Sequence, residues 1–162
     1  MVSLTASEIM ARSEATLAPD TDIYEALAQL LKSKLTGAPV VDAEGGLLGM
    51  LTERDCLKVL VGGALDGRPA GRVSDYMSSP AESVQPDASL YDVAHIFLTR
   101  SFRKLPVVDQ EGRVVGQVSR RDLLVAIEGA HDNTRLYGVR DQLPLEGDGG
   151  VDSAMRHARR ER

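Results

Sequence analysis

Two stretches of the chain carry apolar residues at the spacing of one helix face. In the first stretch, the apolar residues at i, i+3, i+4, i+7 and i+8 are Ile23, Ala26, Leu27, Leu30 and Leu31. The second stretch has the same pattern, with Leu90, Val93, Ala94, Phe97 and Leu98. This spacing predicts an amphipathic helix in each stretch, with the apolar stripe buried and the opposite face in solvent.

A short β hairpin and a second helix are predicted after each of these helices. Valine pairs favour the first strand of each hairpin, and glycine-containing segments favour a tight turn before the second strand. The paired strands are predicted over 39–42 with 47–51 and over 105–109 with 113–118. The helices that follow are predicted from Glu53 to about Val61 and from Arg120 to about Glu128.

The two halves of the chain repeat each other at a constant offset. Pro39-Val-Val-Asp42 recurs 67 positions later as Pro106-Val-Val-Asp109 (106 minus 39), and Met10 recurs as Met77. Each copy spans only about 60 residues, a size at which an isolated unit is marginally stable. The duplication therefore predicts two copies that pack around a pseudo-two-fold axis, with any ligand site occurring twice in a cleft between them.

The repeat divides the chain into four parts. They are a first repeat over 1–62, a glycine-rich linker over 63–72, a second repeat over 73–130 and a C-terminal extension over 131–162. A capping box at Thr5-Ala-Ser-Glu8 predicts a short leading helix that ends near Met10, with its counterpart at 73–77. A helical turn could form at 133–137, but the proline and glycines of 144–150 predict that the extension is partly disordered.

Composition narrows the class of protein. The formal net charge of −5 argues against general binding to nucleic acid or anionic membranes, and the arginines near the C-terminus are expected to be solvated. The single cysteine, Cys56, excludes an intrachain disulfide, although its place at a helix start could lower its thiol pKa. The three histidines lack ligand spacing, so no metal site is expected. Without a leader peptide or an apolar run of roughly 20 residues, the chain is expected to be cytoplasmic and free of membrane contact.

Each copy ends on the same ordered set of motifs. Copy one has Gly37-Ala-Pro-Val-Val-Asp42 and then Gly45-Gly-Leu-Leu-Gly-Met-Leu-Thr-Glu-Arg-Asp55. Copy two has Lys104-Leu-Pro-Val-Val-Asp109 and then Gly112-Arg-Val-Val-Gly-Gln-Val-Ser-Arg-Arg-Asp122. This set resembles the cystathionine-β-synthase (CBS) domain family, as a stand-alone tandem pair. The resemblance implies an α/β (α+β) fold of two repeats, each a small sheet with helices on one face, packed by pseudo-two-fold symmetry.

The same resemblance implies a regulatory module that binds an adenosine ligand and is not an enzyme. The implied ligands are AMP, ADP, ATP or S-adenosylmethionine, with no catalytic cofactor. It also implies a flat homodimer and an unidentified regulated protein, which would be supplied in trans.

In similar family members the aspartate of the Ser/Thr-x-x-Asp motif binds ribose, and the hydroxyl residue lies near phosphate. Carried onto this sequence, Asp55 and Asp122 would bind ribose, while Thr52 and Ser119 would lie near phosphate at a helix start. A carboxylate can accept hydrogen bonds from a pair of ribose hydroxyls, and a helix start favours anions.

Basic residues distinguish the two candidate sites. The second copy carries four near its motifs, namely Arg103, Lys104, Arg120 and Arg121, whereas copy one offers only Arg54. Because phosphate binding needs cationic donors, the second site is better equipped for a phosphorylated nucleotide. The first site could prefer adenosine or a thioether derivative, or could be empty. By the resemblance, the residues expected near the base are Thr16, Ser83, Gly37, Ala38, Pro39, Val40, Leu105, Pro106 and Val107.

Other interpretations of these motifs stay open. Ser/Thr followed three residues later by an acid is also an N-terminal helix cap, worth about 1 kcal/mol without any ligand, and the two roles can coexist. A module with degenerate clefts would be a ligand-free interaction or dimerisation scaffold. An enzyme has the least support, because the sequence shows no nucleophile–base pair and no phosphate loop.

Overall fold

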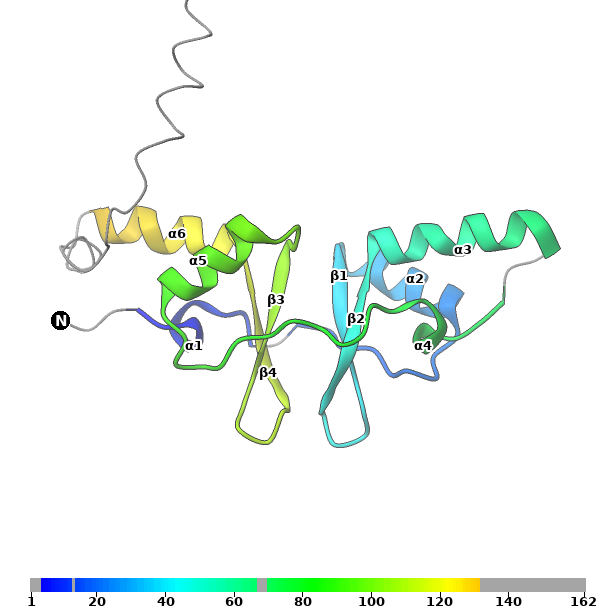
Figure 1. The fold of residues 1–162 in the computed structure, drawn as a ribbon, viewed down its shortest axis with the longest axis horizontal. Helices are drawn as coiled ribbons and strands as arrows, with labels where there is room; N and C mark the ends of the chain where they lie inside the picture. The colour runs from blue at the N-terminus through cyan, green and yellow to red at the C-terminus, as the bar shows by residue number, and fades with distance from the viewer. Residues whose placement is uncertain (1–3, 13, 67–69, 132–162) are drawn as a thin grey trace, which may run out of the picture.

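The computed structural model describes residues 4–12, 14–66 and 70–131 and has two similar halves (Figure 1). The first half contains α2 (Ile23–Lys32), β1 (Gly37–Val41), β2 (Leu47–Thr52) and α3 (Glu53–Asp66). The second half contains α5 (Leu90–Thr99), β3 (Lys104–Val108), β4 (Val114–Ser119) and α6 (Arg120–His131). Two short leading helices are α1 (Ala6–Ile9) and α4 (Val73–Tyr76). The mixed helix-and-sheet fold that the family resemblance implies is therefore confirmed.

The helices α2 and α5 begin at polar caps and bury a narrower stripe than the sequence predicts. The carboxylate of Asp22 accepts a hydrogen bond from the backbone N–H of Tyr24 at 2.9 Å, which caps α2. The buried members of the stripes are Ile23, Ala26 and Leu30 in α2 and Leu90, Val93 and Phe97 in α5. Leu31 and Leu98 were also predicted to be buried, but their side chains are 77% and 85% exposed. Each follows the last buried residue by one position, about 100° further around the helix, so it points away from the sheet.

Each half contains one antiparallel hairpin with the same register. Pro39 pairs with Met50 and Pro106 with Gln117, and both ladders shift register at the last pair. Alternation along the strands directs Ala38, Val40, Leu105 and Val107 into the two cores. The turn glycines Gly45 and Gly112 have φ angles of 86° and 80°, a left-handed conformation that side chains with a Cβ disfavour.

The final helix of each half is longer than predicted. Helix α3 continues past Val61 to Asp66, so residues 63–66 are helical although we assigned them to the linker. A helical glycine costs about 1 kcal/mol relative to alanine, which weakens a helix without ending it.

The C-terminal extension, including the turn predicted at 133–137 and the arginine tail, lies outside the described residues from 132 onward. Across the described ranges, the helices are too short or too polar to cross a bilayer.

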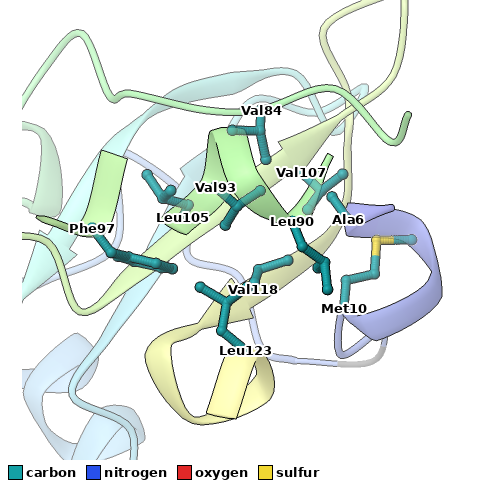
Figure 2. Packing of buried hydrophobic residues seen from close by; sticks show 10 residues of the cluster. All are labelled: Ala6, Met10, Val84, Leu90, Val93, Phe97, Leu105, Val107, Val118 and Leu123. Atoms are coloured by element: carbon teal, nitrogen blue, oxygen red, sulfur yellow. The ribbon is translucent and has the colours of Figure 1, made fainter. Parts of the chain in front are cut away.

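Each leading helix packs in the core of the other repeat. Helix α1 packs in the second half, and α4 packs in the first half. Ala6 and Met10, at the start of the chain, complete the core of the second half, where they face Leu90 and Val107 (Figure 2). Val73 of α4 is buried in the core of the first half. Figure 1 shows the same exchange, with α1 below α5 and α4 below α2 and α3.

Matched backbone hydrogen bonds hold the exchanged segments in place. Ala11 and Gln117 bond to each other through both N–H and C=O groups, with N···O distances of 2.9 and 3.0 Å. Ser78 and Met50 make the equivalent pair of bonds at 2.9 and 3.0 Å. The two pairs are related by the same offset of 67 (78 minus 11, and 117 minus 50). The pseudo-two-fold packing predicted from the repeat is therefore present in the backbone itself.

Two equivalent glycines make room for the exchanged segments. A Cβ placed on Gly116 would lie 2.6 Å from the sulfur of Met10 and 2.8 Å from the carbonyl oxygen of Ala11. A Cβ on Gly49 would lie 2.7 Å from the carbonyl oxygen of Ser78. Since backbone atoms cannot move aside as side chains do, the crossing depends on these two positions having no side chain.

Gly116→Ala is expected to lower the free energy of unfolding by about 1–3 kcal/mol, because the added methyl group overpacks the crossing. Urea denaturation followed by circular dichroism measures the change. Gly62→Ala is the matched control: this exposed glycine of α3 has open space around its Cβ position, and alanine should stabilise the helix by up to about 1 kcal/mol. Equal stability of the two variants would contradict a tight crossing at Gly116.

Candidate functional site

The Thr52–Asp55 motif forms a closed capping arrangement at the start of α3. Oδ2 of Asp55 accepts hydrogen bonds from the backbone N–H and the hydroxyl of Thr52, at 3.0 and 2.7 Å. The backbone N–H of Asp55 donates to the hydroxyl oxygen of Thr52 at 3.2 Å. The capping role that the sequence left open is therefore present, and it occupies one of the two carboxylate oxygens.

The other oxygen of Asp55 also has two donors. Nζ of Lys58 lies 2.7 Å and Oγ of Ser78 lies 3.0 Å from Oδ1 of Asp55. Asp55 itself is only 3% exposed. Ser78 follows α4 and belongs to the second repeat, so its hydrogen bond joins the two repeats. Asp55 is thus surrounded by four donors, two on each oxygen.

These contacts set the pKa of Asp55 and affect its neighbour Cys56. Burial tends to raise the pKa of Asp55, but hydrogen bonds from Lys58, Thr52 and Ser78 outweigh burial and lower the pKa below its ordinary value. Burial raises the pKa of the Cys56 thiol, and the negative charges of Asp55 and Glu53 raise it further. The helix start therefore does not lower the pKa of the Cys56 thiol.

The Ser119–Asp122 motif has the same cap but fewer partners. Oδ2 of Asp122 accepts hydrogen bonds from the backbone N–H and the hydroxyl of Ser119, at 2.6 and 2.7 Å. Oδ1 of Asp122 accepts no hydrogen bond within the described part of the chain. The positions equivalent to Lys58 and Ser78 hold Val125 and Ala11 (58 plus 67, and 78 minus 67), neither of which has a side-chain donor.

The predicted cationic residues lie around the second motif in different states. Lys104 stands directly across the ladder from Ser119, and its Nζ lies 2.9 and 2.8 Å from the two carboxylate oxygens of Glu14. Both side chains of this pair are largely buried, at 17% and 25% exposure. The guanidinium of Arg120 lies 6.0 Å from the centre of the Phe97 ring, in cation–π range. Arg103 and Arg121 are exposed.

The residues predicted near the base fall on both faces of the hairpins. The side chains of Ala38, Val40, Leu105 and Val107 belong to the cores, so only their backbone could meet a ligand. Pro39 and Pro106 point to the opposite face, and their carbonyl oxygens accept hydrogen bonds from the N–H groups of Leu17 and Val84. Gly37 lies across from Thr52, while Thr16 is exposed and Ser83 is half-buried. Contact of these residues with a base stays a prediction.

Several polar residues near the motifs were not predicted from the sequence as site residues. Gln117 is 2% exposed, and its Oε1 has no hydrogen-bond partner among the described residues. It lies two positions before Ser119 on β4, and therefore on the same face of the strand. The equivalent residue in the first copy is Met50, so a residue-by-residue comparison at the offset of 67 could have singled out Gln117, and likewise Ser78 and Lys58.

Asp55→Asn is expected to lower the free energy of unfolding by about 2 kcal/mol at neutral pH, because a buried carboxylate loses hydrogen bonds that include one to charged Lys58. The folded-state pKa of Asp55 lies below the unfolded one, so its contribution is fully present above about pH 4 and is lost as the pH falls through the folded-state pKa. The difference between wild type and variant should therefore shrink in acid. Urea denaturation at a series of pH values measures this difference.

The control for this prediction is Asp87→Asn, which changes an exposed carboxylate. Its effect should stay within about 0.5 kcal/mol at every pH. A wild-type advantage over Asp55→Asn that is constant from neutral to acidic pH would show that the carboxylate charge does not stabilise the fold.

Comparisons of the sequence and of the fold with known proteins point to the same family. The sequence matches the family described as CBS domain over residues 6–62 and 73–129. The protein MJ1225 of Methanocaldococcus jannaschii is 35% identical over 136 residues, which cover 83% of this chain and 47% of that protein. This chain thus spans about half the length of that relative.

Two solved structures share the fold over most of this chain. CBSX2 of Arabidopsis thaliana, in complex with AMP, has a TM-score of 0.70 at 27% identity, covering 78% of this chain and 98% of CBSX2. The CBS domain pair of MJ0100, in complex with 5′-methylthioadenosine and S-adenosylmethionine, has a TM-score of 0.69 at 25% identity, covering 79% and 98%. The matched segments contain both hairpins and both Ser/Thr-x-x-Asp helix starts. The chain belongs to the CBS domain family and contains two CBS domains in tandem.

Proposed function

We propose that this chain is a regulatory module that binds an adenosine ligand and acts on a separate protein, without catalysing a reaction. The observation that carries the proposal is the carboxylate of Asp122, which has one oxygen free of protein donors at the start of α6, as far as the described residues extend. Support comes from CBSX2, solved with AMP, and from MJ0100, solved with two other adenosine compounds. These ligands share adenine and ribose and differ at the 5′ position.

The surroundings of Asp122 suit a nucleoside that carries phosphate. Oδ1 of Asp122 can accept hydrogen bonds from the two ribose hydroxyls. The free N–H groups at the start of α6 favour an anion, and Lys104 places an ammonium group across the ladder from Ser119. Because Glu14 already neutralises Lys104, a phosphate here would share that ammonium with Glu14 rather than meet a free cation. Exposed Arg121, in the first turn of α6, could add a second donor.

Titration with AMP, ATP and S-adenosylmethionine tests the adenosine site. At a ligand concentration of 100 times Kd, binding stabilises a protein by about 2.7 kcal/mol, which raises Tm by several degrees for a chain of this size. At least one of the three compounds is expected to produce this shift in differential scanning fluorimetry. The matched control ligand is the 2′,3′-dideoxy form of the nucleotide, which lacks both ribose hydroxyls and should give no shift.

A negative result in this titration favours the second candidate function. If no adenosine compound shifts Tm at millimolar concentration, the chain is a ligand-free scaffold and the proposed function is wrong. A shift that is equal for ribose and dideoxyribose forms would leave adenosine binding in place but remove ribose recognition by a carboxylate.

We further propose that the regulated state is a homodimer formed through the outer faces of α3 and α6. Leu57 and Leu60 of α3 are 64% and 75% exposed, and their equivalents Leu124 and Ile127 of α6 are 65% and 52% exposed. Residues at this i, i+3 spacing share one helix face. Two equivalent apolar faces within one chain provide the self-complementary surface that a two-fold dimer needs. Leu31 of α2 and Leu98 of α5 are further exposed apolar residues.

The double variant Leu60→Glu, Ile127→Glu is expected to be a folded monomer, because each glutamate would bury a charge in the dimer interface. Sedimentation velocity measures the oligomeric state, and circular dichroism confirms folding. Ala43→Glu is the control, since it adds the same charge in the exposed first hairpin turn and should remain dimeric. A wild-type chain that stays monomeric at high micromolar concentration would contradict this proposal.

A further inference from the structure

The two motif aspartates differ in how much hydrogen-bonding capacity the fold leaves to them. An ionised carboxylate has about four lone-pair sites. At Asp55 four donors occupy them: the N–H and hydroxyl of Thr52, the ammonium of Lys58 and the hydroxyl of Ser78. At Asp122 the described part of the chain supplies only the two donors of Ser119. Two acceptor positions therefore remain at Asp122, the number that a pair of ribose hydroxyls requires.

We propose that the chain binds a single nucleoside, at Asp122, and that Asp55 is a structural link between the repeats and binds no ligand. This inference rests on the proposed function and makes it more specific. A ribose at Asp55 would have to displace Lys58 and Ser78 and would gain no net hydrogen bond to the carboxylate. It would also break the side-chain bond that Ser78 makes across the repeats.

The backbone of Ser78 is fixed beside Asp55 by hydrogen bonds of its own. The N–H and C=O of Ser78 are both bonded to Met50, and the next hydroxyl, of Ser79, donates to the carbonyl oxygen of Leu48 at 2.8 Å. The backbone of Ser78 cannot move away without breaking these bonds, so its Cβ stays beside Asp55 and the hydroxyl is within reach of Oδ1. In the second copy, Ala11 makes the same pair of backbone bonds with Gln117 but carries only a methyl group. The two copies thus differ at this position in the side chain alone.

Lys58 is a weaker partner of the Asp55 carboxylate than Ser78. Lys58 is one turn after Asp55, and its side chain is 56% exposed, so water competes for its ammonium group. At the equivalent position, Val125 offers no donor and leaves the carboxylate of Asp122 open. Closure of the first site therefore depends mainly on Ser78 and is reinforced by Lys58.

A buried acceptor without a partner marks the second copy independently. Oε1 of Gln117 is enclosed, lacks a donor among the described residues and lies on the strand face that also carries Ser119. Leaving such a group unpaired is unfavourable, so native structures generally supply a partner. A ligand N–H or O–H group would supply one. The first copy has Met50 at this position and needs no such partner.

Counting bound AMP per chain by isothermal titration tests the proposal on the full-length protein. Wild type is expected to bind one AMP. Lys58→Val with Ser78→Ala gives the first motif the residues of the second and should raise the stoichiometry to two. The reverse exchange, Ala11→Ser with Val125→Lys, fills the carboxylate of Asp122 with the donors found at Asp55 and should weaken AMP binding by about tenfold or more.

Single substitutions of the aspartates complete the test. Asp122→Asn should weaken AMP binding by at least about tenfold, while Asp55→Asn should keep the affinity within about threefold. If Asp55→Asn does not fold, the double variant Lys58→Val with Ser78→Ala decides the role of the first motif, because it retains Asp55. Gln117→Met is expected to weaken AMP binding without lowering Tm.

The outcomes separate this inference from the proposed function. Two AMP molecules per wild-type chain would overturn the single site and leave adenosine binding intact. If folded Asp55→Asn no longer binds AMP while Asp122→Asn still does, the site lies at the first motif and the proposal is wrong. An unchanged stoichiometry after Lys58→Val with Ser78→Ala would show that these residues do not close the first site. No AMP binding by wild type would overturn both this inference and AMP as the ligand.

Discussion

The fold depends on the exchange of leading segments between the two repeats. The segment around Ala11 lies over Gly116, and the segment around Ser78 lies over Gly49, each held by two backbone hydrogen bonds to the opposite half. The exchange also completes both cores, since Ala6 is buried in the second and Val73 in the first. Small sheets of two strands cannot bury enough apolar surface alone, so each half requires the segment that the other provides.

Most of the local structure could be predicted from the sequence because each element has its own signal. The stripe that begins at Ile23 and the valine pairs of the hairpins led to the correct elements, and the repeated motifs led, through the family resemblance, to the correct fold class. The exchange could not be predicted, because a constant offset does not show which copy a leading helix contacts. Ala6 and Val73 would satisfy either core by hydrophobicity alone. Helical spacing likewise identified Leu31 and Leu98 as apolar stripe residues, but spacing cannot tell a face buried in the core from a face left for another molecule.

The candidate site was predictable only in part, for a similar physical reason. The contact between Ser78 and Asp55 joins residues 23 positions apart through the exchange, so no local pattern indicates it. Roles of the motif residues toward a ligand came from the family resemblance and stay predictions.

The helices that follow the motifs connect the candidate site to the outer surface, since Asp122 lies in the first turn of α6 and Ile127 is exposed further along it. A ligand at Asp122 could therefore shift this apolar face as one rigid element, whereas α3 would transmit nothing comparable if Asp55 is permanently occupied.

The exchange has a consequence for a single repeat. One copy on its own would lack the leading helix that completes its core in this chain, and trading that helix with a second molecule would restore the same arrangement. Joining the copies in one chain turns this association into an intramolecular step at an effective concentration on the order of millimolar. The assembly of the two cores then no longer depends on how much protein is present, so the tandem pair can fold even when it is scarce.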